Sequence, residues 1–203
     1  MDEQFILLMD FFGTAVFALT GSIKGIAHRL DLLGVVVLGC TVGIGGGVLR
    51  DSALGLTPAS ALEDPRYLLF CILVSLLVFL FPRKWLAGNR NIILYADAVG
   101  LGVFTAIGNA KAMQSGMPNI TVVLSGVITA TGGGVIRDLL VRTIPSVLKY
   151  DFYATASLLG GLLYCLLYSF DVPRVPLFWS VAVCVFLLRI IAFYRHLKLP
   201  QKR

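Results

Sequence analysis

The sequence predicts an all-α membrane protein whose seven transmembrane helices form an inverted three-plus-three repeat followed by one C-terminal helix. Two observations lead to this fold. The 203 residues are 58% hydrophobic and only 14% charged, with a mean hydropathy of +0.88, a balance that the surface of a water-soluble protein does not tolerate. In addition, the pattern of residues 10–58 recurs 87 positions later. At about 20 residues per span, this length leaves no room for a soluble domain, so residues 1–203 are expected to form one transmembrane domain.

Apolar runs separated by short polar or proline-containing breaks mark the seven expected helices. They lie at roughly 5–23, 32–56, 67–82, 92–113, 119–141, 152–170 and 176–194. Because the breaks are short, neighbouring helices are expected to pack as antiparallel hairpins. The first repeat is therefore expected over about 5–82, the second over about 92–170, and the seventh helix over about 176–194.

Charged residues predict the orientation in a bacterial-type inner membrane. The first apolar run follows the acidic start Asp2-Glu3 and no small-residue cleavage pattern follows it, so it is expected to be retained as a helix. With the N-terminus outside and the C-terminus in the cytoplasm, the outer loops carry only Arg66 and Arg174. The expected cytoplasmic basic residues are Arg29, Arg83, Lys84, Arg90, Arg142, Lys149, Arg195, Lys198, Lys202 and Arg203. Since these residues are spread between apolar runs, the net charge of +6 does not indicate nucleic-acid binding.

The internal repeat aligns without a gap over 49 positions, of which 16 are identical. The motif GGGVLRD at 45–51 meets GGGVIRD at 132–138, and the other identities are mainly Gly, Asp, Lys and Pro. Chance similarity between two apolar segments would produce identities mainly among aliphatic residues, not among these residue types. Because each repeat holds three spans, the second copy enters the bilayer from the opposite side. Transporters and some channels have this architecture, with the pathway at the interface of the repeats and lined by interrupted helices.

The two glycine triplets are candidates for such an interruption. Gly45, Gly46 and Gly47, like Gly132, Gly133 and Gly134, lie well inside the second span of their repeat. Each glycine costs roughly 1 kcal/mol of helix propensity relative to alanine. A break would free carbonyl oxygens for a permeating cation, whereas the alternative role is close packing of helices through small residues. Two triplets at equivalent places in inverted repeats favour the pathway.

Each triplet is followed directly by an Arg-Asp pair, Arg50-Asp51 and Arg137-Asp138. Charges at this depth are costly unless they are paired or hydrated. Each pair is expected either to gate the mouth of a pathway or to be a snorkelling cation with its counter-ion. Since Asp10, Lys24, Arg50 and Asp51 sum to zero charge, as do their counterparts, the charges do not determine the sign of the permeant ion.

Further charged residues recur within the first span of each repeat. Lys24 and Lys111 are expected either to snorkel or to plug a path. Asp10 and Asp97 lie near the starts of their expected helices, which slightly favours capping of free N–H groups over contact with a solute.

Three polar side chains that lead into the second triplet have no polar counterpart in the first copy. They are Ser125, Thr129 and Thr131, where the first copy has aliphatic residues. The fifth helix is therefore expected to be the more hydrated one and to line the main conduit. The cysteines Cys40, Cys71, Cys165 and Cys184 lie inside apolar runs without the spacing of a metal site, so neither a tight metal site nor a cofactor is expected.

These motifs resemble those of the prokaryotic trimeric intracellular cation (TRIC) channels. The likeness covers nearly the whole chain and rests on both GGGVxRD motifs, on Lys24 and Lys111, and on the three-plus-three-plus-one layout. It implies a homotrimer with one pore in each subunit, a second and a fifth helix kinked at the triplets, and passive potassium-selective conductance. Bacterial relatives also carry a glycine-transporter label. The animal branch has a Lys-Glu-Val stretch where this chain has Gly134, Val135 and Ile136, so the lipid and calcium regulation of that branch is not expected here.

The leading hypothesis is thus a trimeric channel for K+ or Na+, surrounded by membrane lipid. Triplet carbonyls and the hydroxyls of Ser125, Thr129 and Thr131 would replace hydration water, and the Lys, Arg and Asp residues would act as gates. One alternative is a secondary transporter of glycine or a similar small zwitterion, held by the dipoles of broken helices. Another is a non-conducting scaffold in which the glycines only pack helices. An enzyme is not expected, because the polar residues form no nucleophile–base pair or metal cluster.

Overall fold

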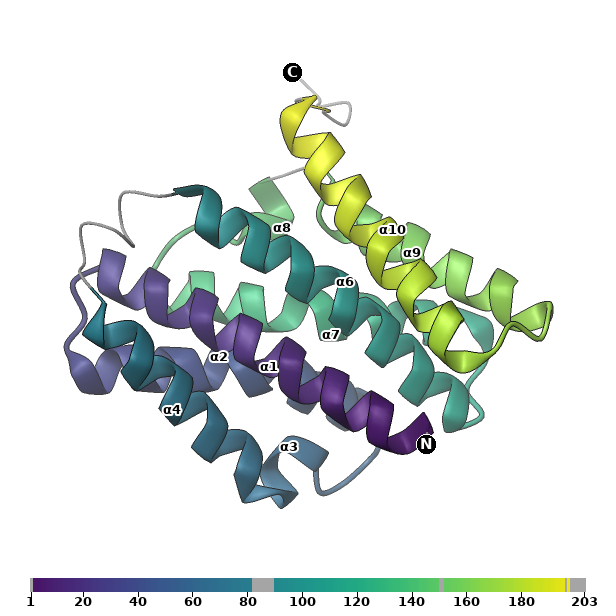
Figure 1. Cartoon of the computed structure of the whole chain (residues 1–203), viewed down its shortest axis with the longest axis horizontal. Coiled ribbons are helices and arrows are strands. Elements are labelled where there is room, and N and C mark those ends of the chain that lie inside the picture. The colour runs from purple at the N-terminus through teal and green to yellow at the C-terminus, as the bar shows by residue number, and fades with distance from the viewer. Residues whose placement is uncertain (1, 82–89, 150–151, 196, 198–203) are drawn as a thin grey trace.

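The computed structural model describes residues 2–81, 90–149, 152–195 and 197, and within them the regular structure is entirely helical (Figure 1). A helix of 16 residues or more coincides with each of the seven apolar runs. The helices are α1 (Asp2–Ala27), α2 (Leu32–Ala53), α3 (Ser60–Glu63), α4 (Pro65–Leu80), α6 (Arg90–Gln114), α7 (Asn119–Leu140), α8 (Ser146–Lys149), α9 (Ala154–Ser169) and α10 (Arg174–Tyr194). Arg83, Lys84, Lys198, Lys202 and Arg203, which were expected to be cytoplasmic, lie outside the described residues.

Five of these helices, α1, α2, α6, α7 and α10, are long and apolar enough to cross a membrane. The apolar helices α4 and α9 have 16 residues each, which corresponds to about 24 Å at 1.5 Å per residue. That is shorter than the roughly 30 Å hydrocarbon core of a typical bilayer. Length and composition therefore establish an all-helical membrane protein with five long apolar helices.

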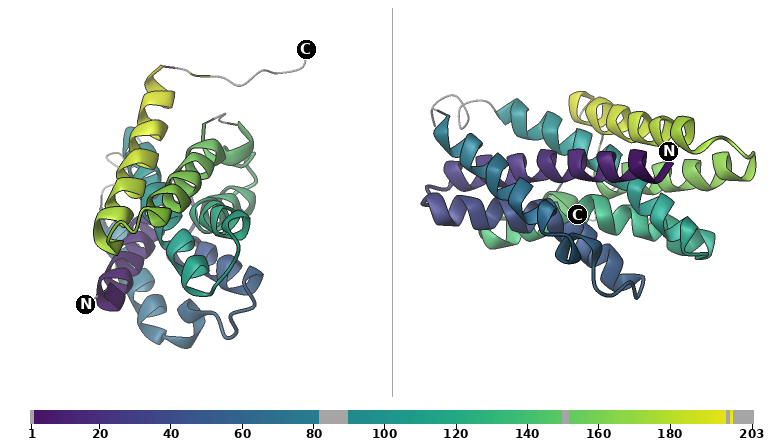
Figure 2. Two further views of the ribbon diagram at one scale, coloured as in Figure 1. Left: turned by 90° about the vertical axis from the view of Figure 1, so that its right-hand side faces the viewer. Right: turned by 60° about the horizontal axis from the view of Figure 1, so that its bottom comes forward.

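Helices at equivalent positions of the two repeats run in opposite directions. In Figure 1, α1 runs from the right of the view to the left and α6 runs from left to right. Helix α1 packs on α2 and α4, and α6 packs on α7 and α9 in the same way, while α10 packs on α6 and α9. The two halves meet where α2 contacts α7 and α1 contacts α6, and Figure 2 shows these helices packed side by side in two further views.

Equivalent residues meet at the centre of this interface. The rings of Phe17 on α1 and Phe104 on α6 have their centroids 4.9 Å apart. Gly46 and Gly133 also lie next to each other, because a Cβ atom added to Gly46 would be 3.6 Å from the Gly133 amide nitrogen. The two halves are thus related by an approximate two-fold arrangement around the glycine triplets and these two rings.

The distribution of polarity is inverted relative to a water-soluble protein. Large aliphatic side chains are exposed on the outer helices, with Leu69 on α4 65% and Leu162 on α9 58% exposed. The charged side chains of Arg50, Asp51 and Arg137 are buried. Apolar surface outside and charge inside is the arrangement that a lipid environment selects.

Helix α4 begins at Pro65, two residues before the expected start, because Asp64 caps it. The Asp64 carboxylate accepts hydrogen bonds from the backbone N–H and the Nε–H of Arg66, both at 2.9 Å. These bonds and the Arg66 charge hold the pKa of Asp64 below its usual value. Proline at the first helical position completes a favourable start, since its missing N–H would be unpaired there anyway.

Candidate functional site

Two clusters of buried charge lie at the C-terminal ends of α2 and α7. The first cluster consists of Asp10, Arg50, Asp51, Tyr67 and Lys111, and the second cluster consists of Lys24, Asp97, Arg137, Asp138 and Tyr153. Because α2 and α7 run in opposite directions, the two clusters lie toward opposite ends of the helix bundle (Figure 1).

In the first cluster, Asp51 is the centre of the hydrogen bonding. Its Oδ1 accepts from Arg50 Nε at 2.7 Å, and its Oδ2 accepts from the Ser60 backbone N–H at 2.9 Å. Lys111 Nζ lies 4.0 Å from Asp51 Oδ2 and donates to Ser60 Oγ at 3.1 Å. Asp10 is bound separately, since its Oδ2 accepts a hydrogen bond from the Tyr67 hydroxyl at 2.9 Å.

In the second cluster, Arg137 is the centre instead. Its Nε donates to Asp138 Oδ1 at 3.1 Å, and its Nη1 donates to Asp97 Oδ1 at 2.8 Å and to Thr20 Oγ1 at 3.1 Å. Asp138 Oδ2 accepts from the backbone N–H and the hydroxyl of Ser146 at 2.8 and 2.9 Å. Each aspartate that follows an arginine therefore also holds the first residue of a short helix, α3 or α8.

The lysines cross between the repeats. Lys24 of the first repeat lies 3.8 Å from Asp138 of the second, and Lys111 of the second lies 4.0 Å from Asp51 of the first. Both lysine side chains are only 20–25% exposed. Snorkelling is therefore the wrong alternative for these lysines, because each reaches a buried carboxylate of the other repeat.

Snorkelling is also wrong for the Arg-Asp pairs. The two arginines and their adjacent aspartates are at most 2% exposed. An ion pair at this depth persists only when its remaining hydrogen-bonding groups are also satisfied, because desolvation of two charges is costly. For Asp51 and Asp138, the backbone N–H groups of Ser60 and Ser146 donate these further hydrogen bonds.

The capping role expected of Asp10 and Asp97 is wrong as well. Helix α1 begins at Asp2 and α6 at Arg90, so both aspartates lie within their helices instead of at the N-cap. Both are buried, and they bind Tyr67 and Arg137 respectively. The apolar residues before each aspartate, such as Ile6 and Ile93, extend the helices upstream by continuing the apolar pattern.

The glycine triplets lie in continuous helix, so the expected interruption is not observed. Both α2 and α7 are helical through their triplets. A Cβ atom added to Gly46 would collide with the Thr129 carbonyl oxygen, and one added to Gly133 would lie 2.5 Å from the Val42 carbonyl oxygen. These glycines let the two backbones approach closely, which is the packing role of small residues in membrane helices.

The third glycine of each triplet has different surroundings. A Cβ atom at Gly47 would have only Arg50 Nη2 within 4 Å, at 3.6 Å. One at Gly134 would meet the Tyr153 hydroxyl at 3.0 Å and Arg137 Nη2 at 3.7 Å. Each triplet therefore packs against the other repeat with its first two glycines and faces a charged cluster with its third.

The three hydroxyls that precede the second triplet are buried within α7. Ser125 donates to the Gly108 carbonyl at 2.9 Å, Thr129 to the Ser125 carbonyl at 2.6 Å, and Thr131 to the Val127 carbonyl at 2.8 Å. Their hydroxyl protons are used by the helices themselves. That they line the main conduit remains a prediction.

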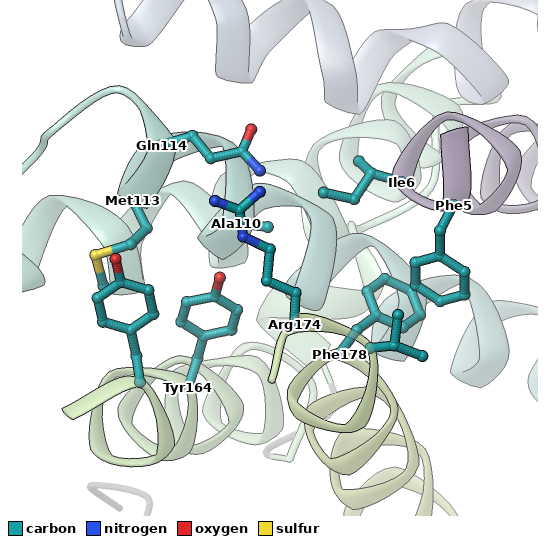
Figure 3. Close-up of a pocket in the computed structure, with 10 residues that line it drawn as sticks. Phe5, Ile6, Ala110, Met113, Gln114, Tyr164, Arg174 and Phe178 are labelled. Carbon is teal, nitrogen blue, oxygen red and sulfur yellow. The ribbon is translucent and has the colours of Figure 1, made fainter. Parts of the chain in front are cut away.

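One cavity adjoins the first cluster, and a second cavity lies next to that one. One, of about 350 Å³, is lined by Asp10, Ser60, Tyr67 and Lys111 together with Ile6, Leu7, Glu63, Asp64 and Gln114. The other, of about 260 Å³, is shown in Figure 3, where Arg174 extends toward Gln114 above the ring of Tyr164. Ile6 and Gln114 line both cavities, so the two lie on either side of the same residues.

Sequence reasoning missed Thr20, Ser60, Tyr67, Ser146 and Tyr153. The pairs Ser60/Ser146 and Tyr67/Tyr153 are separated by 86 positions instead of 87, so a gapless alignment hides them. Allowing a one-residue shift after Pro58 would have revealed both pairs. Thr20 had no such signal, because its counterpart is Ile107.

Comparison with known proteins agrees with this architecture over nearly the whole chain. The glycine transporter family model matches residues 7–83 and 94–169, one stretch in each expected repeat. The inner membrane protein YadS of Escherichia coli K12 is 39% identical over 95% of this chain and 93% of its own. The crystal structure of a TRIC trimeric intracellular cation channel orthologue from Rhodobacter sphaeroides is 34% identical, covers 95% of this chain and 98% of its own, and superposes with a TM-score of 0.88.

A further crystal structure, of a prokaryotic TRIC channel in 0.5 M KCl, is 38% identical, covers 97% of this chain and 100% of its own, and gives a TM-score of 0.88. These similarities extend through both repeats and α10. The chain is therefore a multi-pass membrane protein that belongs to the prokaryotic TRIC family, which the glycine transporter family model describes.

Proposed function

We propose that this protein is a channel for monovalent cations, permeable to potassium, that assembles as a homotrimer with one pore in each subunit. The observation that carries the proposal is the similarity to solved TRIC cation channels, which extends over 95–97% of the chain. The proposed function moves an ion and includes no chemical reaction.

The proposed pore is lined by α2 and α7 and has a charged cluster toward each end. The contact of these antiparallel helices at their triplets supports it, as do Gly47 and Gly134, which face the clusters. Carbonyl and hydroxyl oxygens replace part of the hydration shell of K+ or Na+ in this pore. The carboxylates attract a cation, whereas the lysines and arginines that form ion pairs with these carboxylates act as gates.

In the membrane, the five long helices and the two shorter apolar helices α4 and α9 are all proposed to cross, with the N-terminus outside and the C-terminus in the cytoplasm. Helices α4 and α9 are short for a full bilayer, and local thinning of the bilayer or oligomerisation accommodates such a mismatch. The bias of Lys and Arg toward one set of loops supports the orientation. The proposed location is the inner membrane.

The test is single-channel recording from the purified protein in planar bilayers. Discrete potassium currents that scale linearly with voltage near zero are expected, and the same protein in liposomes should release a potassium gradient. Absence of unitary currents at every voltage would contradict the proposal. The scaffold alternative predicts background flux both for the wild type and for the Gly133→Ala variant.

A second candidate function is secondary transport of glycine or a similar small zwitterion. The description of the matching family model as a glycine transporter favours it. Uptake of labelled glycine into liposomes should then saturate and be inhibited by competing zwitterions. A potassium conductance far above the turnover of a carrier would exclude it. One assay of potassium, sodium and glycine in the same proteoliposomes separates the two candidates.

A further inference from the structure

The two charged clusters contain equivalent residues that are bonded in two different ways. Each repeat supplies one aspartate from its first helix, one arginine that follows its triplet, and one tyrosine beside them. In the first repeat these are Asp10, Arg50 and Tyr67. In the second repeat they are Asp97, Arg137 and Tyr153.

In the first cluster the aspartate is bound to the tyrosine. Tyr67 donates to Asp10 Oδ2 at 2.9 Å, and Arg50 Nη1 is buried with no hydrogen-bond partner among the described residues. In the second cluster the aspartate is bound to the arginine. Arg137 Nη1 donates to Asp97 Oδ1 at 2.8 Å, whereas the Tyr153 hydroxyl, which interacts electrostatically with Asp97, makes no hydrogen bond of normal geometry to a described residue. Each cluster thus leaves unpaired the donor that the other cluster uses.

The difference has an identifiable cause in one residue pair. Thr20 Oγ1 accepts a second hydrogen bond from Arg137 Nη1, at 3.1 Å, and so anchors that guanidinium beside Asp97. The position equivalent to Thr20 is Ile107, which is buried and has no polar atom in its side chain. Arg50 therefore has no equivalent anchor.

We infer that each repeat contains a switch in which its aspartate exchanges between the tyrosine and the arginine, and that the structure holds the two switches in opposite states. The inference rests on the proposed channel function and names the residues that gate it. In the conducting conformation both aspartates are bound to tyrosines. The second cluster, with Asp97 on Arg137, is the closed one of the two.

The tyrosine and the arginine of the second cluster lie beside the same aspartate. A Cβ atom added to Gly134 would be 3.0 Å from the Tyr153 hydroxyl and 3.7 Å from Arg137 Nη2, Arg137 binds Asp97, and Tyr153 interacts electrostatically with Asp97. Moving an aspartate from tyrosine to arginine breaks one hydrogen bond and makes another, so the number of bonds is conserved. Interconverting conformations differ by a few kcal/mol, and a ligand or a voltage that acts differently on the two states can shift such an equilibrium.

The surroundings of the first cluster agree with the assignment of states. The cavity of about 350 Å³ beside it is lined by Asp10 and Tyr67, the two residues that are bonded to each other, and by Lys111. The tyrosine-bound state therefore coexists with open space next to the aspartate. By the equivalence of the repeats, release of Asp97 from Arg137 is expected to open the corresponding space beside Lys24.

The test uses two reciprocal substitutions at equivalent positions. Thr20→Val removes the anchor of Arg137 and is expected to raise potassium flux, whereas Ile107→Thr gives Arg50 an anchor and is expected to lower it. Each change adds or removes about one hydrogen bond, which corresponds to a roughly twofold to tenfold shift of the gating equilibrium. Flux is measured in liposomes and open probability in planar bilayers.

Matched variants separate the anchor from packing. Thr20→Ser keeps the hydroxyl, so its potassium flux should be closer to that of the wild type than the flux of Thr20→Val is. Ile107→Val changes the volume of the side chain without adding a hydroxyl, so it should not lower the flux as Ile107→Thr does. Opposite shifts for the two reciprocal variants support the switch. Shifts of the same sign, or no shift in either variant of a conducting protein, would overturn it.

A second readout does not depend on conduction. With the native cysteines replaced, the rate at which a water-soluble thiol reagent labels Ser60→Cys reports the space beside the first cluster. Ile107→Thr should slow this labelling by about the same factor as it lowers flux, because Asp10 then moves toward Arg50. An unchanged rate would refute the switch even in a protein that conducts. Absence of wild-type currents together with a slowed rate would refute the channel and leave the switch supported.

Discussion

Arg50 and Arg137 occupy equivalent positions and carry different numbers of bonds. Arg137 reaches Asp138, Asp97 and Thr20, whereas the hydrogen bond found for Arg50 within the described residues goes to Asp51. Removal of one partner of a buried ion pair is costly because the other charge stays buried without compensation. The two arginines should therefore contribute unequally to stability.

For this reason Arg137→Gln is expected to lower the free energy of unfolding by about 3–5 kcal/mol, and Arg50→Gln by less. Asp51 and Asp138 each keep a serine and a lysine when their arginine is replaced, but Arg137→Gln also removes the bond to Asp97, which Arg50 does not have to Asp10. Thermal unfolding in detergent measures both. Adding Asp97→Asn to Arg137→Gln should recover part of the loss, and equal losses for the two single variants would contradict the unequal bonding.

Lys111 offers a test of gating at the level of a single charge. Its ammonium group lies 4.0 Å from Asp51 and beside the cavity of the first cluster. Lys111→Met removes a positive charge that repels a cation, so potassium conductance is expected to rise severalfold. Lys111→Arg, which keeps the charge, is the matched control. Unitary conductance in planar bilayers measures the effect, and a lower conductance in Lys111→Met than in Lys111→Arg would argue against an electrostatic gate.

Among the helices, α2 and α7 are defined by what their triplets contact. The first two glycines of each triplet remove side chains where the backbones of the two repeats approach, while the third faces a guanidinium. Loss of helix propensity at three successive glycines is offset by close packing across the interface. The three glycines of a triplet therefore do not all have the same packing role.

The unequal glycines predict unequal variants. Gly46→Ala should lower the free energy of unfolding by about 1–3 kcal/mol, because its methyl group would overlap the Thr129 carbonyl of α7. Gly47→Ala meets only Arg50 Nη2 at 3.6 Å, so it should leave stability unchanged or raise it by up to about 1 kcal/mol through helix propensity. Thermal unfolding of both variants measures the difference. Equal destabilisation would show that the triplet packs as a whole.

For the whole molecule, the cross-repeat ion pairs join the two halves at both ends. Lys24 with Asp138 and Lys111 with Asp51 tie helices that are far apart in the chain. Phe17 and Phe104 fill the space between them. The two halves of the chain are thus held together at both ends and in the middle, while aliphatic side chains such as Leu69 and Leu162 remain exposed on the outside.

Part of that apolar exterior is proposed to be covered by two further copies of the chain. Native mass spectrometry of the protein in a mild detergent should therefore give 66.0 kDa, which is 3 × 22.0 kDa. Cross-linking in the membrane before extraction controls for dissociation by detergent. A mass of one or two copies in both experiments would contradict the trimer.

The sequence predicted the helices better than their contacts. The seven apolar runs coincide with seven helices of 16 residues or more because hydropathy is a property of consecutive residues. The roles of Asp10 and Asp97 were missed because α1 and α6 begin three and two residues upstream of the expected starts, and because their partners Tyr67 and Arg137 are distant in the chain. Tyr67 and Tyr153 were missed because they lie beyond a one-residue shift in the repeat.

The order of residues along the chain was sufficient to establish an apolar helical protein made of two equivalent halves, since both hydropathy and recurrence are read from neighbouring positions. The partner of each charge was decided only in three dimensions. Lys24 meets Asp138, which is 114 positions away, and Arg137 meets Thr20, whose counterpart in the other repeat is the apolar Ile107. The physical reason is that an ion pair or a hydrogen bond depends on the distance between two atoms, and packing of antiparallel helices sets that distance independently of separation in the chain.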